Sequence, residues 1–245
     1  MIVSAVIRRR APYGDVLDEL SPTLVQALAA IPGFWGPDKS PSDVGFMPDF
    51  DSEEFAVLDL RSALAPGLSG LLYYRMFAGD SIDLYADDPD ELGDDVLELD
   101  VDNTVVNYRT FCREIFPEVV RIFGAYRGAV KSDREVQIRD GDSVMERYRE
   151  TGLDVNRRSG IFRIWPVSYF GDELCRRSFR IGAAEVVKRA APICELAEVR
   201  NDGAFLIATS DIVTGKDLDR LSVRIASRIT PWRGFLYRLM HLGSS

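Results

Sequence analysis

Histidine is almost missing from this chain of 245 residues, because His241 is the only one. A catalytic triad that depends on histidine and a metal site with several histidines are therefore disfavoured. Cysteine is scarce as well, and the three residues Cys112, Cys175 and Cys194 lie far apart without the spacing of metal ligands. We expect no zinc site, and we interpret the cysteines as buried thiols in a reducing compartment.

The sequence also lacks the motifs of common enzymes. It has no G-x-G-x-x-G, G-x-x-x-x-G-K-[ST], G-x-S-x-G or H-E-x-x-H segment, and Gly215-Lys216 lacks the upstream glycine of a phosphate loop. We therefore expect a protein that is not an enzyme, with no catalytic residue, no cofactor and no bound metal. The sequence leaves the oligomeric state open.

Long apolar runs are absent too, since none approaches the eighteen or more residues of a membrane span. At the start of the chain, Arg8, Arg9 and Arg10 follow a short apolar run, whereas a secretory signal places its basic residues first. We expect a cytoplasmic protein, or one delivered by a route that the sequence does not show, and no membrane partner.

Acidic residues are abundant in one place. The segment from Asp80 to Asp102 contains eleven carboxylates and no Lys or Arg. Its negative charge is larger than the net charge of −9 of the whole chain, so the acidity is local. Such a local field attracts a basic protein surface or a cation and repels nucleic acid, which the pI near 4.8 also disfavours. The predicted partner-binding residues of this run are Asp87, Asp88, Asp90, Glu91, Asp94 and Asp95.

The acidic run has three other possible interpretations. A calcium loop starting at Asp88 would need an oxygen ligand at its fifth position and glutamate at its twelfth, where Leu92 and Leu99 stand. A catalytic acid–base pair needs one desolvated carboxylate, which a dense run of aspartates does not favour. The third is an exposed loop with no partner.

The pattern of apolar residues predicts an α+β fold, in which helices flank antiparallel sheet. Expected strands cover 2–7, 54–60, 70–77, 81–86, 95–101, 161–170, 194–200 and 203–209, and expected helices cover 15–31, 103–124, 141–151, 172–179, 183–190 and 215–229. Residues 95–101 are predicted to form an edge strand with an acidic outer row, residues 32–52 a long loop, and the tail 232–240 a docked segment. We predict a single domain, 1–245, with a two-lobe division around 131–160 as the alternative.

Short aromatic motifs suggest a relationship. Phe34-Trp35-Gly36 follows an early amphipathic helix, Ile164–Phe170 reads Ile-Trp-Pro-Val-Ser-Tyr-Phe, and Gly203–Ile229 forms a closing strand–helix unit. In these features the chain resembles bacterial polymorphic-toxin immunity proteins, most of all the immunity protein 52 family. The resemblance implies an α+β protein that binds and neutralises a toxin, often of the nuclease type, and it brings no catalytic residues.

These observations give two hypotheses of function. In the first, the chain is an immunity protein that occludes a cognate toxin with its acidic surface, since a nuclease toxin has a basic cleft. Trp35 is interpreted as a core residue, with an anchor in the toxin contact as the alternative. In the second, the chain is an enzyme of unfamiliar class that uses Asp or Glu, with or without a divalent metal. A structural or assembly component is a third alternative.

Overall fold

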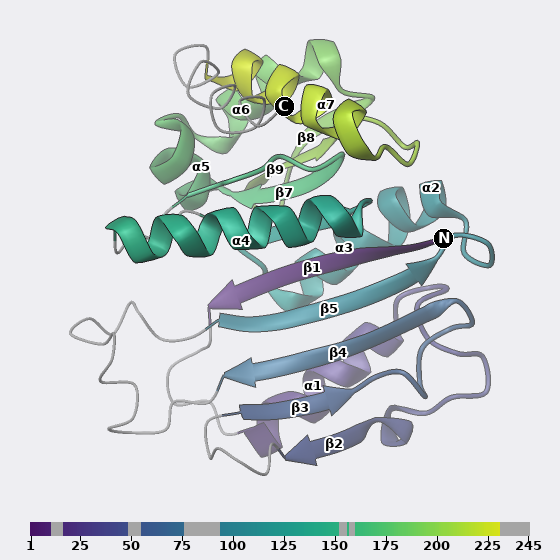
Figure 1. Cartoon of the computed structure of the whole chain (residues 1–245). Coiled ribbons are helices and arrows are strands. Elements are labelled where there is room, and N and C mark those ends of the chain that lie inside the picture. The colour runs from purple at the N-terminus through teal and green to yellow at the C-terminus, as the bar shows by residue number, and fades with distance from the viewer. Residues whose placement is uncertain (11–16, 49–54, 76–93, 152–155, 157–159, 231–245) are drawn as a thin grey trace. The chain divides into compact units, whose positions relative to one another are not determined.

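A computed structural model describes residues 1–10, 17–48, 55–75, 94–151, 156 and 160–230 of the chain. The chain divides into two compact units, Met1–Ala125 and Tyr126–Ser245 (Figure 1). The stretch 131–160, which was the alternative position for a division of the predicted single domain, lies within the second unit. Both units combine antiparallel strands with helices, so the predicted α+β class is confirmed.

The described part of the first unit contains one antiparallel sheet of five strands, in the order β2-β3-β4-β5-β1. The strands are β1 (Ile2–Arg10), β2 (Gly45–Pro48), β3 (Phe55–Asp59), β4 (Leu68–Arg75) and β5 (Asp94–Asp102). β5 lies between β4 and β1, so the prediction of an edge strand there is wrong. Its alternating pattern is that of a strand with one buried face, which a central strand also shows when helices cover a single side.

Helices cover one side of this sheet. α1 (Leu17–Ala29) and α3 (Phe116–Phe123) lie behind the strands in Figure 1. They pack on the side chains that alternate inward, and the inner positions of the two long strands, such as Ala5, Ile7, Leu97 and Leu99, are fully buried. Because side chains alternate along a strand, the other positions of β4 and β5 point to the opposite side.

The predicted helix over 103–124 is interrupted. Asn107 caps α2 (Tyr108–Thr110), a π-helical turn follows over Phe111–Ile115, and α3 then begins at Phe116. Pro117 explains the change of pitch, because proline has no N–H to donate and its ring clashes with the preceding turn of an α-helix. The helix ends as expected at Gly124, which has a φ of +65°.

The predicted loop over 32–52 contains ordered elements that sequence reasoning missed. A 3₁₀ turn (Pro41–Asp43) is closed by a capping box in which Ser40 and Asp43 bond to each other's backbone. β2 follows this turn and pairs antiparallel with β3. The pairing with β3, and not the sequence pattern of β2 itself, makes these residues a strand. The expected strand over 81–86 and the expected tail contact at 232–240 lie outside the described residues.

The described part of the second unit contains a four-stranded antiparallel sheet in the order β6-β7-β9-β8. Its strands are β6 (Arg127–Lys131), β7 (Val167–Gly171), β8 (Leu196–Arg200) and β9 (Gly203–Ile207), and its helices are α4 (Arg134–Thr151), α5 (Asp172–Phe179), α6 (Ala183–Ala190) and α7 (Gly215–Ile229). Asn201 and Asp202, the two residues between the last two expected strands, have positive φ, as a tight hairpin turn between paired strands requires.

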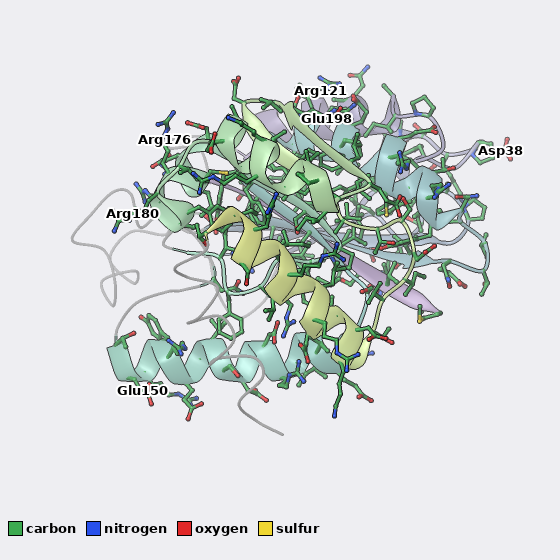
Figure 2. All side chains as sticks on the ribbon, turned by 90° about the horizontal axis from the view of Figure 1, so that it is seen from above. Asp38, Arg121, Glu150, Arg176, Arg180 and Glu198 are labelled. Carbon is green, nitrogen blue, oxygen red and sulfur yellow. The ribbon has the colours of Figure 1, made fainter. Side chains whose placement is uncertain are left out.

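Two predicted elements of this unit differ in length. The strand expected over 161–170 forms only over Val167–Gly171, and the helix expected over 141–151 begins earlier, at Arg134. Val136 and Asp140 are the buried residues of α4, so its later turns are largely exposed. Figure 2 shows Glu150 pointing away from this helix.

One carboxylate caps two helices that lie far apart in sequence. Asp133 accepts a hydrogen bond from the Val136 N–H at the start of α4 (3.0 Å) and another from the Gly215 N–H at the start of α7 (2.7 Å). Thr214, which precedes the second helix and has a residue type that often caps helices, occupies the N-cap position without a side-chain hydrogen bond. Burial alone would raise the pKa of Asp133, but the N–H donors of Gly215, Val136 and Glu135 outweigh it and lower that pKa.

Candidate functional site

The side of the first sheet opposite to α1 and α3 carries the exposed part of the acidic run. On β5, Leu97, Leu99 and Val101 point towards the helices and are buried. Glu98 and Asp100 alternate with them and are exposed, as the predicted acidic outer row requires. In Figure 1 the viewer looks onto this side of β3, β4 and β5.

Neighbouring strands add further residues to the same side. Leu71 of β4 lies opposite Glu98, and Asp59 of β3 lies opposite Leu71. Tyr73 follows two positions along β4, so it lies diagonal to Glu98. These residues are partly exposed. We call this surface the acidic sheet face, and it consists of Asp59, Leu71, Tyr73, Glu98 and Asp100.

The charges of the acidic sheet face are only partly compensated. Asp59 holds Arg61 through two contacts, from Nε to Oδ1 at 2.8 Å and from Nη2 to Oδ2 at 2.5 Å. Glu98 and Asp100 form no ion pair with any other residue that the structure describes. Partial burial, followed by the fields of Glu98 and Asp100, raises the pKa of Tyr73. The face therefore combines an aromatic and an aliphatic side chain with two carboxylates that have no ion-pair partner among the described residues.

Two of the predicted partner-binding residues lie inside the first unit. The side chains of Asp94 and Asp95 are each 3% exposed. Asp94 lies 3.8 Å from Nη1 of Arg8, and Asp95 accepts a hydrogen bond of 2.8 Å from Nε of Arg9. The expectation of an exposed acidic loop that reaches Asp95 is thus corrected, because antiparallel pairing with β1 brings two arginines onto these carboxylates.

The surroundings of Arg9 show how far inside this pair lies. Its guanidinium carbon is 5.0 Å from the ring centroid of Phe123 in α3 and 5.9 Å from that of Tyr74 in β4. A guanidinium between two aromatic faces gains cation–π attraction and keeps its charge next to Asp95. The other predicted residues, Asp87, Asp88, Asp90 and Glu91, lie outside the described part of the chain.

Trp35, the predicted anchor or core residue, is 9% exposed. Its segment is held against the turn after β3, since the Gly36 N–H donates to the Ala63 carbonyl and the Ala65 N–H donates to the Phe34 carbonyl. Phe34 packs beside it, with 6.4 Å between the ring centroids. The core interpretation agrees with this burial, and in this conformation Trp35 offers little surface to a partner.

The reactive side chains of the described residues include carboxylates and three cysteines. Within them, no group of three or more His, Cys, Asp or Glu side chains is placed to hold a metal ion. None of the three cysteines forms a disulfide, and Cys112 and Cys175 are buried. Burial raises the pKa of the Cys175 thiol to about 12, so it stays protonated at neutral pH and is a poor nucleophile.

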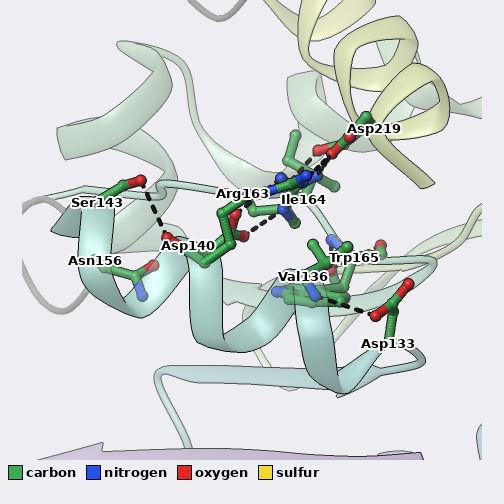
Figure 3. Close-up of polar contacts among 12 residues, drawn as sticks. Asp133, Val136, Asp140, Ser143, Asn156, Arg163, Ile164, Trp165 and Asp219 are labelled. Carbon is green, nitrogen blue, oxygen red and sulfur yellow. Dashed lines mark hydrogen bonds and ion pairs between the residues drawn. The ribbon is translucent and has the colours of Figure 1, made fainter. Parts of the chain in front are cut away.

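The second unit has a buried polar cluster, which Figure 3 shows in close-up. Arg163 is 1% exposed and lies between Asp140 of α4 and Asp219 of α7. Its Nη2 donates to Oδ1 of Asp140 at 2.9 Å, and its Nη1 forms an ion pair with Oδ1 of Asp219 at 2.8 Å. Arg139 reaches the same Asp219 oxygen from the outside, also at 2.8 Å.

This cluster ties three segments together and is occupied by its own members. Its two carboxylates face two guanidinium groups, so the charges cancel, and the ring of Trp165 lies 5.8 Å from the Arg163 guanidinium carbon. Each carboxylate is less than a tenth exposed, which leaves little access for a substrate. We therefore interpret the cluster as a structural tie, and the acidic sheet face remains the candidate functional site.

No helix in the described ranges has both the length and the apolarity that crossing a membrane requires.

Comparisons with known proteins give structural relationships only. The sequence matches no protein-family model and no curated protein. Among solved structures, the chain is similar to the T6SS protein PA0821 of Pseudomonas aeruginosa, with a TM-score of 0.53 and 12% sequence identity. The similarity covers 98% of this chain and 74% of that protein. At this identity the similarity shows a shared fold, and the resemblance to the immunity protein 52 family stays a prediction.

Proposed function

We propose that this chain is a cytoplasmic immunity protein that binds a cognate bacterial toxin, of the nuclease type, and neutralises it by occupying its basic cleft. The observation that carries the proposal is the pair of exposed carboxylates, Glu98 and Asp100, which have no counter-charge among the described residues. Basic residues that bind a nucleic-acid backbone would be complementary to them. The proposed action is stoichiometric binding and needs no catalytic group.

Two further features support the proposal. Tyr73 and Leu71 lie next to the carboxylates, and an interface that lasts needs such apolar and aromatic area beside its charges. The fold shared with a T6SS protein is compatible with a bacterial toxin system, although the relationship is distant. The toxin to be tested is the product of the gene next to that of this chain.

The test measures association kinetics of the double variant Glu98→Gln/Asp100→Asn with that toxin at low and at physiological salt. The on-rate at low salt should fall by roughly two- to tenfold, and the dependence of the on-rate on salt should weaken, because exposed charges steer encounter. A matched control, Asp142→Asn/Glu150→Gln, removes the same charge from exposed positions of α4 in the second unit. The control should bind like the unaltered protein.

Two outcomes would contradict the proposal. If the unaltered chain does not bind the toxin, the immunity function is wrong. If the toxin binds but the double variant and the control have equal on-rates at both salt concentrations, the acidic sheet face is only a solvated surface. In that case, the next positions to neutralise would be the four predicted partner-binding residues outside the described part of the chain, Asp87, Asp88, Asp90 and Glu91.

A further inference from the structure

One corner of the first sheet exposes apolar side chains at the end of the acidic row. Ile2, the first residue of β1, is 65% exposed, and Val105, in the loop after β5, is 60% exposed. Figure 1 shows the start of β1 beside this loop. Exposed apolar groups gathered at one place mark interaction sites more often than single scattered ones.

Hydrogen bonds hold this corner in one conformation. The Asn103 N–H donates to the Met1 carbonyl at 3.1 Å, and the Asp102 N–H donates to the Gly67 carbonyl at 2.8 Å. The Asp102 carboxylate in turn accepts from the Thr104 N–H at 3.0 Å and from its hydroxyl at 2.7 Å. The tip that carries Val105 is therefore already ordered, which lowers the conformational entropy lost on binding.

Gly67 packs directly beneath this tip. A Cβ added there would lie 2.8 Å from Cβ of Val105 and 2.9 Å from Cγ2 of Val106, so only glycine allows the loop to approach so closely. The φ of Gly67 is +84°, which also favours glycine. The backbone of the loop thus packs against Gly67, while the side chain of Val105 projects into solvent.

The acidic row begins at the same corner. Ile2 lies opposite Asp102, Ser4 opposite Asp100 and Val6 opposite Glu98, so all these positions point to one side of the sheet. Successive carboxylates on one face of a strand are about 7 Å apart. The exposed apolar side chains of this corner are therefore followed along β5 by the carboxylates of Asp102, Asp100 and Glu98, each farther from the corner than the one before.

We infer that Ile2 and Val105 insert into an apolar depression of the toxin, and that Lys or Arg side chains on the rim of that depression face Asp100 and Glu98. This inference rests on the proposed function and adds an anchor to it. An apolar centre beside a charged flank is the usual composition of an interface in which a few residues determine the lifetime of the complex.

The test compares Val105→Ser with Val199→Ser, which makes the same substitution at a residue of β8 that is 54% exposed. With the toxin of the neighbouring gene, Val105→Ser should raise the off-rate about tenfold and leave the on-rate and its salt dependence unchanged. Val199→Ser should bind like the unaltered protein. Equal melting temperatures of the two variants would show that the fold is preserved.

A second variant, Ile2→Ser, probes the other half of the tip and should also raise the off-rate. If both tip variants dissociate at the rate of the unaltered chain, the anchor is refuted, while a slower on-rate of Glu98→Gln/Asp100→Asn would leave the proposed function intact. If a tip variant instead lowers the on-rate alone, the tip takes part in encounter and is not an anchor. If the unaltered chain does not bind the toxin, both proposals fail.

Discussion

Replacing Arg163 by methionine should destabilise the second unit strongly. The substitution keeps much of the aliphatic stem but removes the charge that faces Asp140, whose side chain is 9% exposed. Asp219 would keep its ion pair with Arg139, whereas Asp140 would lose both hydrogen bonds from Arg163. Breaking a buried pair in this way costs about 3–5 kcal/mol, because an uncompensated charge is left inside.

The measurement is urea denaturation followed by far-UV circular dichroism. Arg149→Met is the matched control, since Arg149 is exposed on α4 and its loss should change the free energy of unfolding by less than about 0.5 kcal/mol. The double variant Arg163→Met/Asp140→Leu removes the orphaned carboxylate and should recover more than about half of the lost stability.

The reasoning would be refuted by either of two results. One is a loss of less than about 1 kcal/mol in Arg163→Met, which would mean that Asp140 finds water or another donor at little cost. The other is a double variant less stable than the single one, because the penalty would then arise from packing and not from the unpaired charge.

Two further predictions concern helices. Gly141→Ala should raise the free energy of unfolding by about 0.5–1 kcal/mol, since a Cβ there meets no atom within 4 Å, whereas Gly124→Ala, with equal space but a φ of +65°, should lower it by about 1–2 kcal/mol. Thermal unfolding checks both signs, and a stabilised Gly124→Ala would contradict the strain. Asp133→Ala should cost about 2 kcal/mol near neutral pH, because both caps are lost. Because folding lowers the pKa of Asp133, its contribution to stability is complete above the unfolded pKa of about 3.9 and is lost as the pH falls through the folded pKa. Urea titrations of the unaltered protein and of Asp133→Ala at several pH values measure this contribution. A stability difference between the two proteins that grows towards acid pH would be inconsistent with it.

The features predicted correctly from the sequence are those that local pattern determines. The turn at Asn201-Asp202 tolerates positive φ, so two residues define the hairpin. Alternation along β5 correctly placed Glu98 and Asp100 outward. Gly124 ends its helix by the same kind of local conformational freedom.

The features that were missed depend on partners outside the local sequence pattern. Asp94 and Asp95 look like exposed charges until β1 supplies Arg8 and Arg9, some 86 positions earlier. Asp133 caps α7 across 82 positions, so no window of sequence around Thr214 reveals the true cap. The four residues of β2 have no strand pattern of their own and form a strand because β3 pairs with them. The free carboxylates of the acidic sheet face were counted in the acidic run, but their lack of a counter-charge required the structure.

The pairing of β1 with β5 also has a consequence during synthesis on the ribosome. Asp94, where β5 begins, is 84 positions beyond Arg10, where β1 ends. At a synthesis rate of about 5–20 residues per second, β1 therefore remains without its partner strand β5 for about 4–17 s. During that time the apolar part of β1 is followed directly by the three arginines at its end, Arg8, Arg9 and Arg10. Basic residues beside an apolar segment discourage aggregation. When β5 arrives, two of these arginines meet Asp94 and Asp95, so the charges that protect the nascent strand also favour the native register.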